Sequence, residues 1–211
     1  MLTLEKARAW YRTADAVHDF EHIQRVWAMA ERLALAEGAD LEIVRAAVLL
    51  HDAEGATPGN AEGRAAHHEN SAEFAREVLL AEGWPEERIA AVQHCIRAHR
   101  FRGGEPPRTL EAQILFDADK LDVLGAIGVA RVVAYAALAG EPLTAEVSES
   151  FRSRFEKAPN EPHTPYHEFL FKLSRIKDRL HTRTARALAA ERHTYLSEFF
   201  ERLHAEIKGE Q

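Results

Sequence analysis

Apolar residues recur every three or four positions over nearly the whole chain, which is the spacing of one face of an α-helix. Phe20, Ile23, Val26, Ala30 and Leu33 form the first clear run. No segment alternates apolar and polar residues as a half-buried β-strand does, and no internal repeat is visible. The pattern therefore predicts an all-α fold.

The length of the chain favours one domain. Its 211 residues, 46% of them hydrophobic, are enough to bury one good core and few for two. We expect a single domain over residues 1–211, with its core at about 18–135 and C-terminal helices at about 164–207 packed on that core. The apolar helix around 188–203 seals either this core or a homodimer interface.

Capping and turn residues predict the helix boundaries. Asp19 and Asp40 each precede an apolar run and are expected to cap it, whereas the Gly- and Pro-rich stretches 55–63 and 103–107 are expected to be loops. The polar segment 140–163 is interpreted as an ordered insertion or a mobile lid. Further helices are expected at about 67–82, 85–100, 110–139, 173–180 and 188–203.

Two prolines fit the start of a helix. Pro85 is expected in the first turn of the helix at 85–100, where its missing N–H costs nothing. Thr164 followed by Pro165 is typical of a cap and a first-turn proline.

Composition narrows the function classes. A net charge of -7 counts against a stable nucleic-acid partner, because phosphate binding usually requires a basic excess. Basic residues do gather between Arg175 and Arg192, and we interpret them as a solvated helix face. No stretch approaches the roughly 20 apolar residues of a membrane span, and no signal peptide is visible, so we expect a cytoplasmic protein without membrane partners. Cys95 is the only cysteine, which excludes a Cys-rich zinc site and predicts a small buried hydrophobe.

Four residues form a candidate metal site: His22, the adjacent pair His51 and Asp52, and Asp119. His51 and Asp52 end an apolar helix, so they are expected to project from a buried element. Two imidazoles and two carboxylates from three helices can hold one divalent ion and leave positions for water and substrate. Mixed nitrogen and oxygen ligands suit Mn, Fe, Co, Ni or Zn better than Ca or Mg.

These motifs resemble the signature of the HD-domain metal-dependent phosphohydrolase superfamily, and most closely the bacterial hydrolases of the YedJ/YpgQ type. The resemblance covers about residues 1–207. Its motifs are His18-Asp19-x-x-His22-x-x-Arg25, Leu50-His51-Asp52, Asp117-Ala-Asp119-Lys120-Leu-Asp122, Leu124-Gly-Ala-Ile-Gly-Val-Ala-Arg131, and the tail from Lys172 through Thr182 to Arg192.

The resemblance implies an all-α fold with a metal centre in its core, held by His22, His51, Asp52 and Asp119. It implies hydrolysis of a phosphoester or phosphoanhydride by metal-bound water, with a nucleotide as the substrate class. We expect one divalent transition metal, Mn first, with Fe, Co, Ni, Zn or Mg as alternatives. A second ion stays open, because further histidines follow the His-Asp pair.

Other residues are assigned around this centre. Asp52 is expected to accept a proton from the attacking water, and Glu54 to orient or deprotonate it. His18, Asp19 and Asp122 are expected to support the ligands. His67 is expected at the surface. The residues expected to face substrate phosphates are His68, His99, Lys120, Arg131 and Lys172.

Two alternatives to a pyrophosphohydrolase-type enzyme remain. One is a phosphodiesterase or nuclease, which the basic residues between Arg175 and Arg192 would support. The other is a non-catalytic module that senses nucleotides through a bound metal.

Overall fold

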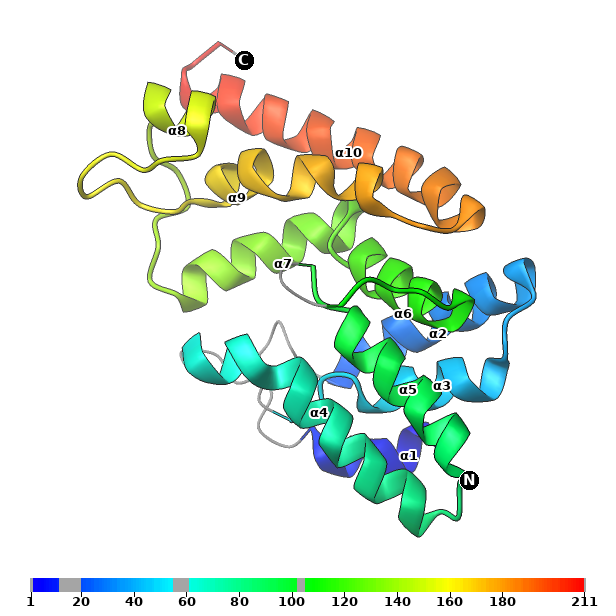
Figure 1. Ribbon diagram of the computed structural model, residues 1–211. Helices are drawn as coiled ribbons and strands as arrows, with labels where there is room; N and C mark the ends of the chain where they lie inside the picture. The colour runs from blue at the N-terminus through cyan, green and yellow to red at the C-terminus, as the bar shows by residue number, and fades with distance from the viewer. Residues whose placement is uncertain (1, 12–19, 55–60, 102–104, 211) are drawn as a thin grey trace. The chain divides into compact units, whose positions relative to one another are not determined.

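The computed structural model describes residues 2–11, 20–54, 61–101 and 105–210, the side chains of 61–66 excepted. Within these ranges every regular element is a helix, which confirms the all-α fold (Figure 1). The elements are α1 (Leu4–Ala7), η1 (Arg8–Trp10), α2 (Phe20–Glu37), α3 (Leu41–Leu50), α4 (Ala61–Ala81), α5 (Glu86–Ala98), α6 (Leu110–Leu121), α7 (Gly125–Leu138), α8 (Glu149–Arg154), α9 (Pro165–Phe171), η2 (Leu173–Arg179) and α10 (Arg183–Ile207).

The helices form two compact units, of which the first comprises Met1–Lys120 and Leu180–Ala185. Helix α3 packs against α2 and α5, and α5 also packs against α4 (Figure 1). Every residue from Ala46 to Leu50 is buried, so α3 is apolar on nearly all sides. The two residues that follow it, His51 and Asp52, therefore emerge inside this unit.

The second unit comprises Leu121–Arg179 and Arg186–Gln211. In it α9 runs along α10, where the rings of Phe169 and Phe200 stack at 4.6 Å between centroids. Phe151 of α8 is buried against the ring of His167, at 4.7 Å. The segment 140–163 thus contains a helix, and its assignment as an ordered insertion or a mobile lid stays a prediction. The single domain expected from the length stays a prediction.

The predicted caps at Asp40 and Thr164 are confirmed. Asp40 Oδ1 accepts the N–H groups of Glu42 and Ile43 at 2.9 and 3.2 Å. Thr164 Oγ1 accepts the N–H of His167, and Pro165 is the first residue of α9. Asp19, the other predicted cap, lies outside the described residues.

The helix predicted at 110–139 is wrong, because it is two helices, α6 and α7. Gly125 opens α7 with φ of +68°, a conformation that glycine adopts without strain. Arg192 donates from its guanidinium to the carbonyl of Leu121 at 2.6 Å, so the end of α6 keeps a hydrogen-bond partner. The apolar spacing runs through the break, and periodicity alone therefore missed it.

Three other boundaries also differ from the predictions. Helix α4 begins at Ala61 instead of 67, because the alanine-rich stretch 61–66 favours a helix despite Gly63. Pro85 lies one residue before α5, as its N-cap, and α5 ends at Ala98. The stretch 173–179 forms a tighter 3-10 helix instead of an α-helix.

Two further expectations concern burial and membranes. Cys95 is fully buried, as predicted. In the described ranges no single helix is long and apolar enough to cross a membrane. Taken together across their break, α6 and α7 have the length and composition of a membrane span.

Candidate metal centre

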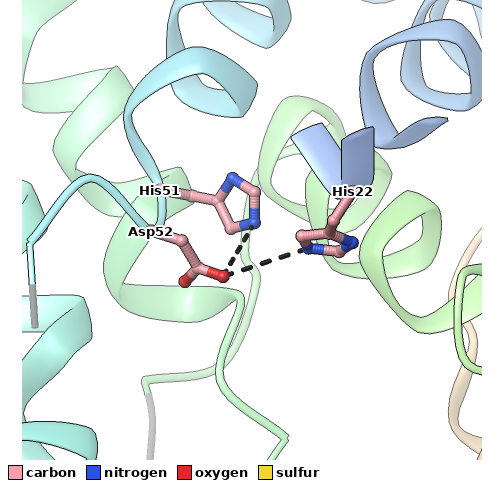
Figure 2. A group of neighbouring side chains, drawn as sticks. All are labelled: His22, His51 and Asp52. Atoms are coloured by element: carbon pink, nitrogen blue, oxygen red, sulfur yellow. Dashed lines mark ion pairs between the residues drawn. The ribbon is translucent and has the colours of Figure 1, made fainter. Parts of the chain in front are cut away.

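The ends of buried helices in the first unit bring the predicted ligands together. His22 lies in the first turn of α2, His51 and Asp52 directly follow α3, and Asp119 lies in the last turn of α6. All four side chains are largely buried, with exposed fractions of 16% or less. Figure 2 shows His22 and His51 approaching the Asp52 carboxylate from two helices.

The distances place both imidazoles against carboxylate oxygens. Asp52 Oδ2 lies 3.5 Å from His51 Nε2 and 3.9 Å from His22 Nε2. His22 Nε2 also lies 3.5 Å from Asp119 Oδ1. The ligand atoms of His22, His51 and Asp52 all fall within 4.8 Å of one another, which is close enough for a single ion to contact each of them.

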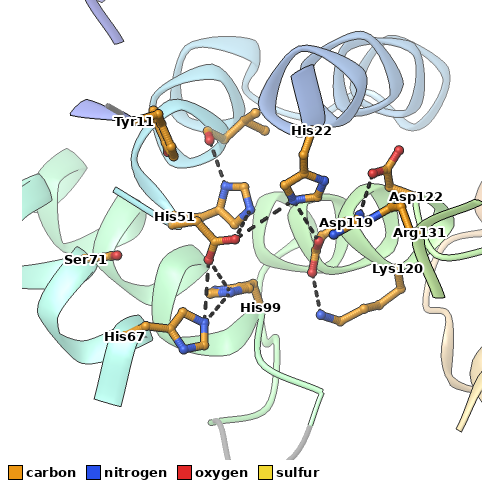
Figure 3. A network of polar contacts seen from close by, with 12 residues as sticks. Tyr11, His22, His51, His67, Ser71, His99, Asp119, Lys120, Asp122 and Arg131 are labelled. Carbon is orange, nitrogen blue, oxygen red and sulfur yellow. Dashed lines mark hydrogen bonds and ion pairs between the residues drawn. The ribbon is translucent and has the colours of Figure 1, made fainter. Parts of the chain in front are cut away.

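A second group lies on the other side of Asp52. Asp52 Oδ1 is 3.6 Å from His67 Nε2 and 3.4 Å from His99 Nε2, and the two imidazole nitrogens are 3.2 Å apart. Figure 3 shows His67 and His99 close together, below His22 and His51 in the view. Asp52 is therefore shared by two groups of candidate metal ligands.

The tautomers of His51 and His99 follow from backbone contacts. The Nδ1 atoms lie 2.8 Å from the carbonyl of Val48 and 2.5 Å from that of Ile96, respectively. A carbonyl only accepts, so each Nδ1 donates its proton, and in the neutral form of each ring the Nε2 lone pair is directed at Asp52. Histidine ligands of metals are commonly oriented by this kind of backbone hydrogen bond.

A cation fits this arrangement. His51 Nε2 is buried and has no hydrogen-bond partner among the described residues, while its lone pair faces a carboxylate oxygen. Two electron-rich atoms at 3.5 Å repel each other unless a positive charge lies between them. The donor set of the chain thus matches the divalent ion expected from the sequence.

The pKa shifts keep the candidate ligands in their binding forms. Burial raises the pKa of Asp52, but the positive charge that His51 and His99 carry when protonated outweighs it and holds that pKa well below its usual range. Burial also raises the pKa of Asp119, but Lys120 and His22 outweigh it in the same way. Burial lowers the pKa of His99 to about 4, so its ring is neutral at pH 7.

Other predicted residues of the first unit lie around the ligands. Lys120 forms an ion pair with Asp119 through its ammonium group. The Glu54 side chain is exposed, and its N–H donates to Ser71 Oγ at 3.1 Å, which ties the turn after Asp52 to α4. His68 is buried, with its Nε2 3.7 Å from Glu69 Oε1. His18 lies outside the described residues, as Asp19 does.

Three predicted residues belong to the second unit. Arg131 donates to Asp122 Oδ2 at 2.6 Å, and Lys172 pairs with Glu168 at 3.2 Å. Arg131 and Lys172 thus each have a carboxylate partner within their own unit, and a role at the metal centre stays a prediction for all three residues.

The surface position predicted for His67 is wrong. Its side chain is 17% exposed and contacts Asp52 and His99. Neighbouring residues of a helix point about 100° apart, so only one of His67 and His68 can face the centre. The helical period of 3.6 residues per turn does not say which of the two faces the centre unless the rotation of α4 about its axis is known.

Two anchoring residues were missed by the sequence analysis. Tyr11 donates its O–H to the carbonyl of Leu49 at 2.9 Å, one turn before Asp52. Asp117 is buried and accepts the N–H groups of His181 and Thr182 at 2.9 and 2.7 Å, as well as the Thr182 hydroxyl at 2.8 Å. The motif Asp117-Ala-Asp119 could have indicated a separate role for Asp117. Residues two positions apart lie on different faces of a helix, so the two carboxylates cannot both face the metal centre.

Buried histidine and aspartate side chains at the ends of helices form a candidate metal site in an all-helical protein. The chain matches the HD domain family over residues 19–124, half of its length. It belongs to this family, whose domains bind divalent metals, and it is a metal-dependent phosphohydrolase. The resemblance drawn from the motifs is therefore confirmed.

Relatives match nearly the whole chain. YpgQ of Bacillus subtilis (strain 168) is 30% identical over 97% of this chain and 94% of YpgQ. The crystal structure of YpgQ in complex with ADP has a TM-score of 0.75 at 29% identity and covers 99% of this chain and 100% of that one. An HD-superfamily hydrolase from Bacillus thuringiensis has a TM-score of 0.67 at 27% identity, over 97% of this chain and 94% of its own.

Proposed function

We propose that this phosphohydrolase cleaves a phosphoanhydride bond of a small nucleotide. The observation that carries the proposal is the buried cluster of His22, His51, Asp52 and Asp119 with a lysine ammonium beside it, because such a site attracts a metal bound to phosphates. The ADP complex of YpgQ supports a nucleotide, since that relative matches this chain from end to end.

The proposed metal site uses His22, His51, Asp52 and Asp119 for one divalent transition metal, with Mn as first choice. A bound ion of this kind lowers the pKa of water and neutralises charge on a phosphoryl oxygen. We propose a second ion, bound by Asp52, His67 and His99, because Asp52 directs one oxygen to each group of histidines.

The chain's own residues are assigned as follows. Lys120 holds its ammonium at the Asp119 carboxylate, where it can also attract a substrate phosphate. Glu54 is exposed two residues after Asp52 and is our candidate proton acceptor, together with Asp52 itself. The expected contacts of His68, Arg131 and Lys172 with phosphates remain part of this proposal, and so does the cytoplasmic location.

A phosphorus NMR time course tests the proposed reaction. The Mn-loaded protein is mixed with ribo- and deoxyribonucleoside mono-, di- and triphosphates. We expect triphosphates to yield pyrophosphate and a monophosphate, a result that would establish attack at the α-phosphorus. The variant Asp119→Ala is expected to abolish this hydrolysis. Orthophosphate released from monophosphates would instead identify a nucleotidase. Silence across the panel with metal bound would reject the proposal in favour of a diester substrate or a sensing module.

Metal removal is expected to lower the thermal stability of the protein. Without a cation, the lone pairs of His51 and His99 face the ionised Asp52 in a buried site. An ion present at about 100 times its Kd stabilises the folded state by about 2.7 kcal/mol. Calorimetry after chelation should therefore show a Tm several degrees lower, restored by Mn²⁺ but not by Ca²⁺. An unchanged Tm in the protein shown to be metal-free would contradict the assignment.

A further inference from the structure

We propose that Phe101, Phe116 and His181 form a nucleobase-binding subsite next to the metal centre. This inference rests on the proposed nucleotide substrate and deepens it, since it names the residues that recognise the base. The three residues are called the aromatic group below. They come from the turn three residues after α5, from α6 and from the segment 180–185, all within the first unit.

In the aromatic group, two partly exposed residues pack against a buried one. Phe116 is only 4% exposed, whereas Phe101 and His181 are half-buried. The rings of Phe101 and Phe116 are nearly parallel, at 20° and 6.5 Å between centroids. His181 meets Phe116 edge-on, at 76° and 5.0 Å. Two partly exposed rings thus rest on a third that is fixed in the core, and an aromatic face is what a purine or pyrimidine stacks on.

The lysine of the metal centre joins this group to the ligands. Phe116 and Lys120 lie one turn apart on α6, and the Lys120 ammonium is 5.6 Å from the centre of the Phe116 ring. The same ammonium pairs with Asp119, a proposed metal ligand. A cationic group that can bind phosphates therefore lies next to aromatic rings that can stack on a base. A nucleotide requires both, because its phosphates are at one end and its flat base is at the other.

The position of His181 is fixed before any ligand binds. Its backbone N–H donates to Asp117 Oδ1, and the next residue, Thr182, gives the same carboxylate two more hydrogen bonds. Asp117 and Phe116 are neighbours on α6, so the helix that carries Asp119 also holds His181. A backbone held in this way has little conformational freedom left to lose on binding, which favours affinity.

A pair of probes that differ only in the nucleoside tests the subsite. ADP and inorganic pyrophosphate are titrated calorimetrically into the Mn-loaded full-length protein and into the variants Phe101→Leu and His181→Leu. Tyr195→Leu, at an aromatic residue of the second unit that is 50% exposed, is the matched control. Phe116 is left unchanged because its burial makes it a core residue.

We expect each variant to weaken ADP binding on the order of tenfold, as loss of one stacking contact does, and to leave pyrophosphate binding within twofold. In kinetics, KM for nucleotides should rise by a similar factor, while kcat changes much less. ADP bound by both folded variants as tightly as by the wild type, or an equal loss for ADP and pyrophosphate, would overturn the subsite alone. A wild type that binds neither probe would overturn the proposed function as well.

Discussion

Replacing Asp52 by alanine is expected to remove divalent metal from the protein and to lower kcat/KM for the proposed substrate by about three orders of magnitude or more. Asp52 is the residue shared by both ligand groups, at 3.4 to 3.9 Å from four imidazoles. Metal ions supply several kcal/mol of charge stabilisation in phosphoryl chemistry, and each ~1.4 kcal/mol corresponds to a factor of ten. Metal content after gel filtration and initial rates measure the two effects.

Asp178→Ala is the matched control, because Asp178 is an exposed aspartate of the second unit. It should retain full metal content and activity. Asp52→Asn, which keeps the shape of the side chain, separates loss of the ligand charge from loss of folding, and circular dichroism verifies that the variants are helical. Wild-type metal content in a folded Asp52→Ala protein would refute the shared-ligand assignment.

His67→Ala is expected to reduce the number of bound Mn²⁺ ions from two to one per chain. His67 lies against the Asp52 oxygen that faces away from His51, so its loss should weaken the second ion at least tenfold and spare the first. His22→Ala should do the reverse and weaken the first ion. Equilibrium dialysis with Mn²⁺ gives the stoichiometry, and electron paramagnetic resonance detects the coupling of two adjacent ions.

His68→Ala provides the comparison for this measurement, since His68 is the next residue of α4 and belongs to neither ligand group among the described residues. It should bind as many ions as the wild type. One ion per wild-type chain at saturating Mn²⁺ would exclude the second site, and the contact between His67 and His99 would then be a hydrogen bond in the absence of a second metal.

The boundaries of several helices followed from local chemistry. Asp40 and Thr164 cap their helices because a short polar side chain can accept free N–H groups of the first turn, and this depends on the neighbouring residues alone. The break between α6 and α7 did not follow from the apolar spacing, which runs through it. The guanidinium that bonds the Leu121 carbonyl at this break belongs to Arg192, about 70 residues further along the chain. The same limit applies to the 3-10 helix at 173–179, whose apolar spacing resembles that of an α-helix.

The candidate ligands His22, His51, Asp52 and Asp119 were determined by the sequence itself, since their spacing on apolar helices and their motifs need no tertiary information. Only the tertiary structure decided which oxygen of Asp52 faces which histidine, and that His67 rather than His68 enters the centre. The physical reason is that the direction of a side chain depends on how its helix is rotated in the packed core. That rotation is set by contacts between segments distant in sequence, so a local sequence pattern does not predict it.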